Sequence, residues 1–189
     1  MPAGSRRFGY YGRLSARNRA IYRRSDAITR LDLPEPQALH PAVVAIADAL
    51  AEDDRRAVQR ATQGLATQVC RALSAPRVAL RVLARRPADA EGELHGLYVR
   101  HEDGRAYIRV WMRTAAHERV VAFRTFLRTL LHELCHHLDY EVLELADSYH
   151  TKGFFQRESS LVRQLAPASL TPPSHHEATI EQLSLPGLG

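Results

Sequence analysis

The sequence predicts an α+β fold in which a small β-sheet packs against one long helix, with additional helices before the sheet. Apolar residues recur at three- and four-residue intervals over about residues 117–140, which is the period of one buried helix face. Apolar and polar residues alternate around residues 78–83 and 105–113, which is the period of half-buried strands. A chain of 189 residues, 45% of them hydrophobic, is long enough to form one domain with a sizeable core.

The first 35 residues form a basic segment. It contains arginines interleaved with aromatic residues, namely Arg6, Arg7, Arg13, Arg17, Arg19, Arg23, Arg24 and Arg30 with Phe8, Tyr10, Tyr11 and Tyr22. Such a mixture is typical of surfaces that contact phosphates and stack on nucleic-acid bases. The favoured alternative is a solvated helix over about residues 15–31 that docks on the core through Ile21, Tyr22 and Ile28, because charge runs usually form solvated faces.

Two helices are expected next. The run Leu33-Pro34-Glu35-Pro36 breaks any helix and marks a boundary. Residues 41–50 and 53–73 then show helical periodicity, and Asp53 or Asp54 is a suitable N-cap for the second helix. These helices are expected to be scaffold.

Three strands are expected over residues 78–83, 94–100 and 105–113. The last two form a hairpin closed by Glu102-Asp103-Gly104, since Asp-Gly is a strong turn signal. One edge of this sheet is suited to pairing with an extended peptide, and the equal alternative is that Trp111 only covers the sheet.

The remaining elements are two helices and a tail. The longest helix is expected over about residues 117–140, and a further helix opens at Tyr149 and continues to about residue 165. The chain then becomes proline-rich. The predicted organisation is a basic segment over 1–35, one globular domain over 36–165 and a flexible tail over 166–189.

Composition excludes several classes of protein. No stretch approaches the roughly 20 apolar residues of a membrane span, and no secretion signal follows the basic N-terminus, so a cytoplasmic protein with no membrane partner is expected. The only cysteines are Cys70 and Cys135, which excludes a disulfide framework and a four-cysteine zinc site. The net charge of +5 permits an acidic partner.

Residues 132–136 read His-Glu-Leu-Cys-His, an HExxH motif within the helix expected over 117–140. Histidines four residues apart lie on one helix face and can bind a single metal ion, and the glutamate between them can act as a base toward a metal-bound water. The motif therefore predicts a Zn²⁺ site with His132 and His136 as ligands and Glu133 as the catalytic base. Cys135 lies near enough to approach the metal, but a packed thiol is the favoured interpretation.

Catalytic zinc usually takes three protein ligands, so one more is needed. We expect His150, because it starts a helix that can fold back across the first. Glu158 is the alternative; it lies about 12 Å further along that helix, so the two cannot bind one ion. Asp139 and Val142 stand where the metzincin pattern needs glycine and histidine, which excludes that class.

The run from Leu130 to Leu165 resembles the SprT-like group of minimal zincins. These proteins carry HExxH on one helix and a third histidine, in an H-x-x-x-F setting, at the next. His150-Thr151-Lys152-Gly153-Phe154 matches that setting, although Thr151 replaces a common glycine. The resemblance covers about residues 76–165. It implies a zincin-like fold and a zinc metallopeptidase that hydrolyses protein substrates, with DNA-associated proteins as one expected class.

Two other functions stay open: a non-proteolytic regulator with a structural metal site, and a nucleic-acid-binding protein in which the metal unit is secondary. Asp139 either orients a metal ligand or is an exposed helix carboxylate. Tyr140, Tyr149 and Arg157 are each candidates to stabilise an oxyanion, and the sequence does not choose among them.

Overall fold

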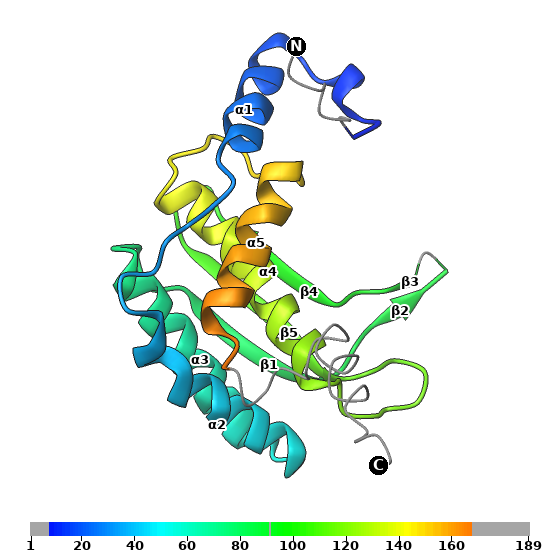
Figure 1. The fold of residues 1–189 in the computed structure, drawn as a ribbon. Coiled ribbons are helices and arrows are strands. Elements are labelled where there is room, and N and C mark those ends of the chain that lie inside the picture. Colours follow the sequence, from blue (N-terminus) through cyan, green and yellow to red (C-terminus); the bar gives the residue numbers. More distant parts are fainter. Residues whose placement is uncertain (1–7, 91, 168–189) are drawn as a thin grey trace, which may run out of the picture.

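The computed structural model describes residues 8–90 and 92–167, and this part of the chain has an α+β fold, as expected (Figure 1). Its helices are α1 (Ala16–Ala27), α2 (His40–Ala51), α3 (Arg55–Ala72), α4 (Phe123–Glu141) and α5 (Lys152–Leu165), with 3-10 turns at Tyr11–Arg13 and Pro36–Leu39. Its strands are β1 (Ala79–Arg85), β2 (Ala88–Asp89), β3 (Gly92–Glu93), β4 (Gly96–Arg100) and β5 (Ala106–Arg113). None of the described helices is both long and apolar enough to cross a membrane.

The main sheet has the strand order β1-β5-β4, with β1 parallel and β4 antiparallel to β5. The expected hairpin of β4 and β5 is confirmed, and Gly104 adopts the positive φ of +81° that its turn requires. Leu80, Ile108 and Val110 are buried on one face of the sheet, whereas Arg81 and Arg109 are exposed on the other. The long helix α4 packs on the buried face (Figure 1).

Helix α3 lies against the outer edge of β1 and satisfies its backbone. The side-chain amide of Gln59 donates to the Leu80 carbonyl and accepts from the Val82 amide, at 2.9 and 2.8 Å. Gln63 does the same at the Val78 carbonyl and the Leu80 amide, at 3.1 and 2.9 Å. Asp54 caps the start of α3. These bonds replace the ladder that a further strand would supply, so β4 is the edge strand without such a cover.

The described part of the basic segment packs on the domain through α1. Ser15 caps this helix, which ends at Ala27 rather than at residue 31. Tyr22 and Ser25 are buried, and the chain at Ser25 and Asp26 lies so close to α5 that a Cβ on Gly153 would be 2.5 Å from both carbonyl oxygens. Only glycine permits this approach, so α1 and α5 form one packed unit.

Helix α4 begins six residues later than its apolar pattern indicated. Residues 117–122 instead turn back beside the end of β5: Val120 forms a bridge with Arg113, and the Val121 amide donates to the Met112 carbonyl at 2.8 Å. Val121 is buried, so its apolar character comes from packing beside the sheet. From Phe123 onward the expected helix is confirmed.

Helix α5 begins at Lys152, two residues after His150. Thr151 is its N-cap, and its hydroxyl accepts from the Phe154 amide at 2.9 Å. The expectation that His150 starts the helix is therefore wrong, because the next residue, Thr151, has the extended backbone of an N-cap, with φ −94° and ψ 170°. His150 belongs to the segment that joins α4 to α5.

Candidate metal centre

Three imidazole rings converge at the C-terminal part of α4. His132 and His136 lie on one face of α4, and His150 approaches that face from the segment before α5. The Nε2 atom of His150 lies 3.0 Å from that of His132 and 3.1 Å from that of His136. One nitrogen from each ring lies within 4.8 Å of the others, which is a spacing that can hold a metal ion.

The spacing and the protonation of these rings fit zinc. Bonds of about 2.0–2.1 Å in a tetrahedral site place two nitrogen ligands roughly 3.3 Å apart, close to the observed distances. Burial, and then the neighbouring charges of His132 and His150, lowers the pKa of His136 to about 3. Burial also lowers the pKa of His150. A lowered pKa favours the neutral imidazole, which is the form that binds a metal.

A carboxylate contacts the Nδ1 atom of His132, the ring nitrogen that faces away from the converging Nε2 atoms. Glu158 is buried on α5, and its Oε2 lies 3.0 Å from His132 Nδ1, while its Oε1 accepts from Arg128 at 2.6 Å. The structure thus places Glu158 behind His132 and brings His150 to the point where the Nε2 atoms converge. A carboxylate in this position orients an imidazole toward a metal.

A chain of hydrogen bonds links the Nδ1 atom of His136 to a buried carboxylate through a serine hydroxyl. His136 Nδ1 lies 2.8 Å from Ser148 Oγ, and Ser148 Oγ donates to Asp139 Oδ2 at 2.8 Å. Asp139 is fully buried, so the alternative of an exposed helix carboxylate is wrong. Burial raises its pKa, against the opposing effect of Arg157.

Arg157 ties this chain to α1. Its side chain is fully buried, and Nη2 donates to both oxygens of Asp139 at 2.8 and 3.0 Å. It also donates to the carbonyl of Ser25 at 2.7 Å and to the Ser25 hydroxyl at 3.1 Å. One hydrogen-bonded path therefore joins His136 to Arg157 and to Ser25, which lies 132 residues before Arg157 in the sequence.

Glu133 lies against the edge strand β4. Its side chain is buried, and the Tyr98 amide donates a hydrogen bond to its carboxylate. Burial raises the pKa of Glu133 to about 7, while His132 and the Tyr98 amide act in the opposite direction. A carboxyl group with a pKa in this range can both accept and return a proton near neutral pH.

Gly96 makes room for Glu133. A Cβ at residue 96 would lie 2.8 Å from both Cγ and Cδ of Glu133 and closer still to Oε1. If Glu133 is the catalytic base that the motif predicts, Gly96→Ala should displace its carboxylate and lower kcat/KM by about 100-fold, as misplacement on the order of 1 Å can do. Circular dichroism should show an unchanged fold, and steady-state hydrolysis by the zinc-loaded protein measures the effect.

The matched control is Gly64→Ala on α3, where a Cβ would meet no atom within 4 Å. This variant should keep full activity and gain slight stability, because alanine is the better helix former. Equal activity of the two variants would show that Glu133 does not need its present position.

The other candidates have different surroundings. Cys135 is fully buried and burial raises its pKa, as expected of a packed thiol. Tyr140 donates to Asp147 at 3.3 Å. Burial and a hydrogen bond to the same Asp147 raise the pKa of Tyr149 to about 12. Because Arg157 is enclosed, the two tyrosines remain the candidates for an oxyanion donor.

Sequence reasoning missed Gly96, Tyr98 and Ser148. Gly96 stands at the start of an expected strand, and Ser148 stands between expected helices; neither position carries a spacing that points to the metal motif. Their roles follow from contacts between segments that are distant along the chain.

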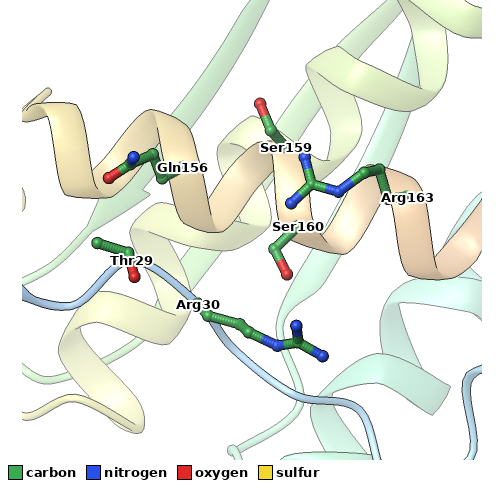
Figure 2. Close-up of a pocket in the computed structure, with 6 residues that line it drawn as sticks. All are labelled: Thr29, Arg30, Gln156, Ser159, Ser160 and Arg163. Atoms are coloured by element: carbon green, nitrogen blue, oxygen red, sulfur yellow. The ribbon is translucent and has the colours of Figure 1, made fainter.

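A cavity of about 440 Å³ lies elsewhere, between α5 and the chain that follows α1 (Figure 2). It is lined by Thr29, Arg30, Gln156, Ser159, Ser160 and Arg163. These side chains offer no metal ligands and no base beside a nucleophile. The candidate chemistry therefore lies at the histidines.

Comparison of the chain with protein-family models, curated proteins and solved structures found no match.

Proposed function

We propose that this protein is a zinc-dependent metallopeptidase of the zincin type, resembling the SprT-like group, which hydrolyses peptide bonds in protein substrates. The observation that carries the proposal is the convergence of His132, His136 and His150 on one point beside a buried carboxylate. A purely structural metal site, as in a non-proteolytic regulator, has no need of Glu133. The Tyr98 amide of the edge strand β4 donates a hydrogen bond to that carboxylate.

In the proposed reaction, His132, His136 and His150 would hold the zinc ion. Bound zinc supplies Lewis-acid chemistry, because it lowers the pKa of water and polarises a carbonyl. Glu133 accepts the proton of the attacking water and later delivers it to the leaving amine. Glu158 and Ser148 keep the imidazoles oriented throughout, because each contacts the Nδ1 atom of a ligand ring.

The edge strand β4 is suited to hold the substrate. Among the described strands it pairs with β5 alone, and on its other side the Tyr98 amide donates to Glu133, so an extended peptide would align along this edge next to that carboxylate. Glu133 contacts β4 at Gly96 and Tyr98. A peptide aligned along this edge brings its backbone to the base.

Removal and return of the metal test the proposal. The purified protein should contain about one zinc per chain, and chelation should abolish cleavage of a broad pool of unstructured protein substrates. Zinc should restore it. Full cleavage by the chelated protein, or no bound zinc in the purified protein, contradicts the proposal.

A nucleic-acid partner bound by the arginine-rich N-terminal segment remains a second proposal. Several of its arginines are engaged within the protein: Arg19 donates to the Gly12 carbonyl, Arg23 to Tyr11 and Arg24 to the Leu143 carbonyl. Arg13 and Arg17 are exposed, which favours them as phosphate contacts.

Deletion of residues 1–35 is unsuitable as a test, because it removes Ser25 from the fully buried Arg157. Charge reversal is the better design. If the proposal holds, Arg13→Glu with Arg17→Glu should weaken binding to a labelled DNA, measured by anisotropy, and reduce the steepness of its salt dependence. Substituting the exposed Arg60 and Arg71 of α3 in the same way is the control for net charge. Equal loss in both double variants contradicts a specific N-terminal site.

A further inference from the structure

Exposed aromatic rings lie directly beside the candidate metal centre. In the described ranges, the large hydrophobic side chains that are exposed are Phe8 at 40%, Leu94 at 42% and Phe155 at 39%. Two of these are in contact, since the ring centroids of Phe8 and Phe155 are 5.9 Å apart. Adjoining exposed apolar groups at a functional site are typical of ligand-binding surfaces.

Phe155 is in contact with two of the candidate metal ligands. Its ring stacks on that of His150, with centroids 5.7 Å apart and an interplanar angle of 19°, and lies 6.2 Å from that of His132. The adjacent Phe154 is buried and packs beneath the same imidazoles. Phe154 therefore packs against the candidate ligands from within the protein, whereas Phe155 presents its ring to solvent.

Phe8 is held in place by the N-terminal segment. The backbone amide of Phe8 contacts the Tyr22 hydroxyl at 3.4 Å, and its ring stacks on Tyr10. The Tyr10 hydroxyl donates to the carbonyl of His150 at 2.9 Å, and its ring stacks on Tyr149. The surface is thus formed in advance by contacts that reach the third ligand itself.

We propose that Phe8 and Phe155 form a recognition surface for a bulky apolar side chain of the peptide substrate, next to the bond that is cleaved. This inference rests on the proposed peptidase function. A carbonyl within reach of Glu133 and the imidazoles places the neighbouring residues about one strand spacing, ~3.4 Å per residue, to either side. The ring that stacks on His150 is therefore within reach of an adjacent side chain.

The partner is a substrate side chain because the surface is small and continuous with the proposed reaction site. Peptides with phenylalanine or leucine beside the scissile bond should be preferred over those with alanine. Pockets that bind apolar groups discriminate by about tenfold or more for each methylene group lost.

Two readouts test this surface separately from the proposed function. Short soluble peptides that differ only in a central Phe-Phe or Ala-Ala pair are first bound to the zinc-loaded Glu133→Gln variant, in which turnover is expected to be blocked, and anisotropy gives their affinities. They are then offered to protein with an intact Glu133. The Phe-Phe peptide should bind and be cleaved at least about tenfold better. Phe155→Ala and Phe8→Ala should each remove most of this preference, with zinc content unchanged.

Phe155→Leu should retain the preference, since it keeps an apolar surface. Tyr107→Ala, which removes a half-buried ring from the opposite face of the sheet, is the control and should change nothing. Equal affinity for both peptides, binding of neither, or an unchanged preference in Phe155→Ala overturns the inference. Preferential binding without any cleavage supports the surface and contradicts the peptidase.

Discussion

Substituting Glu133→Gln is expected to abolish peptide hydrolysis while the protein keeps its zinc. The amide has the shape of the carboxylate and can still accept the hydrogen bond from the Tyr98 amide. It cannot take a proton from water, and the loss of a general base lowers rates by about 10²- to 10⁴-fold. Zinc analysis and kcat/KM on one peptide measure the two properties independently.

Glu158→Gln is the matched control, because it changes the other buried carboxylate near His132. Glu158 contacts Nδ1 of the imidazole, on the side away from the converging Nε2 atoms. Its loss should weaken zinc binding by about 10- to 100-fold and leave turnover near normal at saturating zinc. His136→Ala should lose both zinc and activity. Normal turnover by zinc-loaded Glu133→Gln would remove the base from the proposed reaction.

Arg157→Met is expected to destabilise the fold by about 3–5 kcal/mol, which is the effect of breaking a buried ion pair by removing one partner. The Arg157 and Asp139 side chains are both 0% exposed, so the variant leaves a carboxylate in the core without its counter-ion. The carbonyl of Ser25 loses its donor as well. Denaturant unfolding of the metal-free protein, followed by circular dichroism, measures the change.

The same variant should bind zinc more weakly than wild type, because Asp139 holds Ser148 against His136. Arg85→Met is the control. It also breaks an arginine–carboxylate pair, but Arg85 and Glu118 are 56% and 61% exposed, and such pairs contribute little. Equal unfolding curves for Arg157→Met and wild type would show that the buried network does not stabilise this fold.

Sequence patterns predicted the elements that depend on residues close together in the chain. The helix carrying His132 and His136 follows from apolar spacing, and the hairpin follows from Asp103-Gly104. The start of α4 was predicted too early because Val120 and Val121 were read as part of the apolar face of a helix. Their apolar side chains instead pack beside β5, with which both residues pair. Apolar spacing indicates that a residue is buried, but it does not tell whether the residue is buried on a helix face or beside a strand.

The surroundings of the histidines depend on contacts that no local pattern contains. Arg157 and Ser25 are 132 residues apart in the sequence. From the sequence, Arg157 was a candidate oxyanion donor and Ser25 had no predicted role. The need for glycine at residue 96 appears only when Glu133 from α4 lies over β4. The third histidine was predicted from its motif, but it lies before the next helix and not within it, because Thr151 is the N-cap of α5.

The glutamines of α3 also bear on how copies of this molecule can assemble. A fibre that grows by strand addition needs two unpaired sheet edges on each copy, so that each copy can pair with a neighbour on both sides. In the described part of the chain, Gln59 and Gln63 occupy the border at β1. Within this sheet strand addition is therefore confined to the β4 edge, where Glu133 already binds the Tyr98 amide, and it cannot propagate into a polymer.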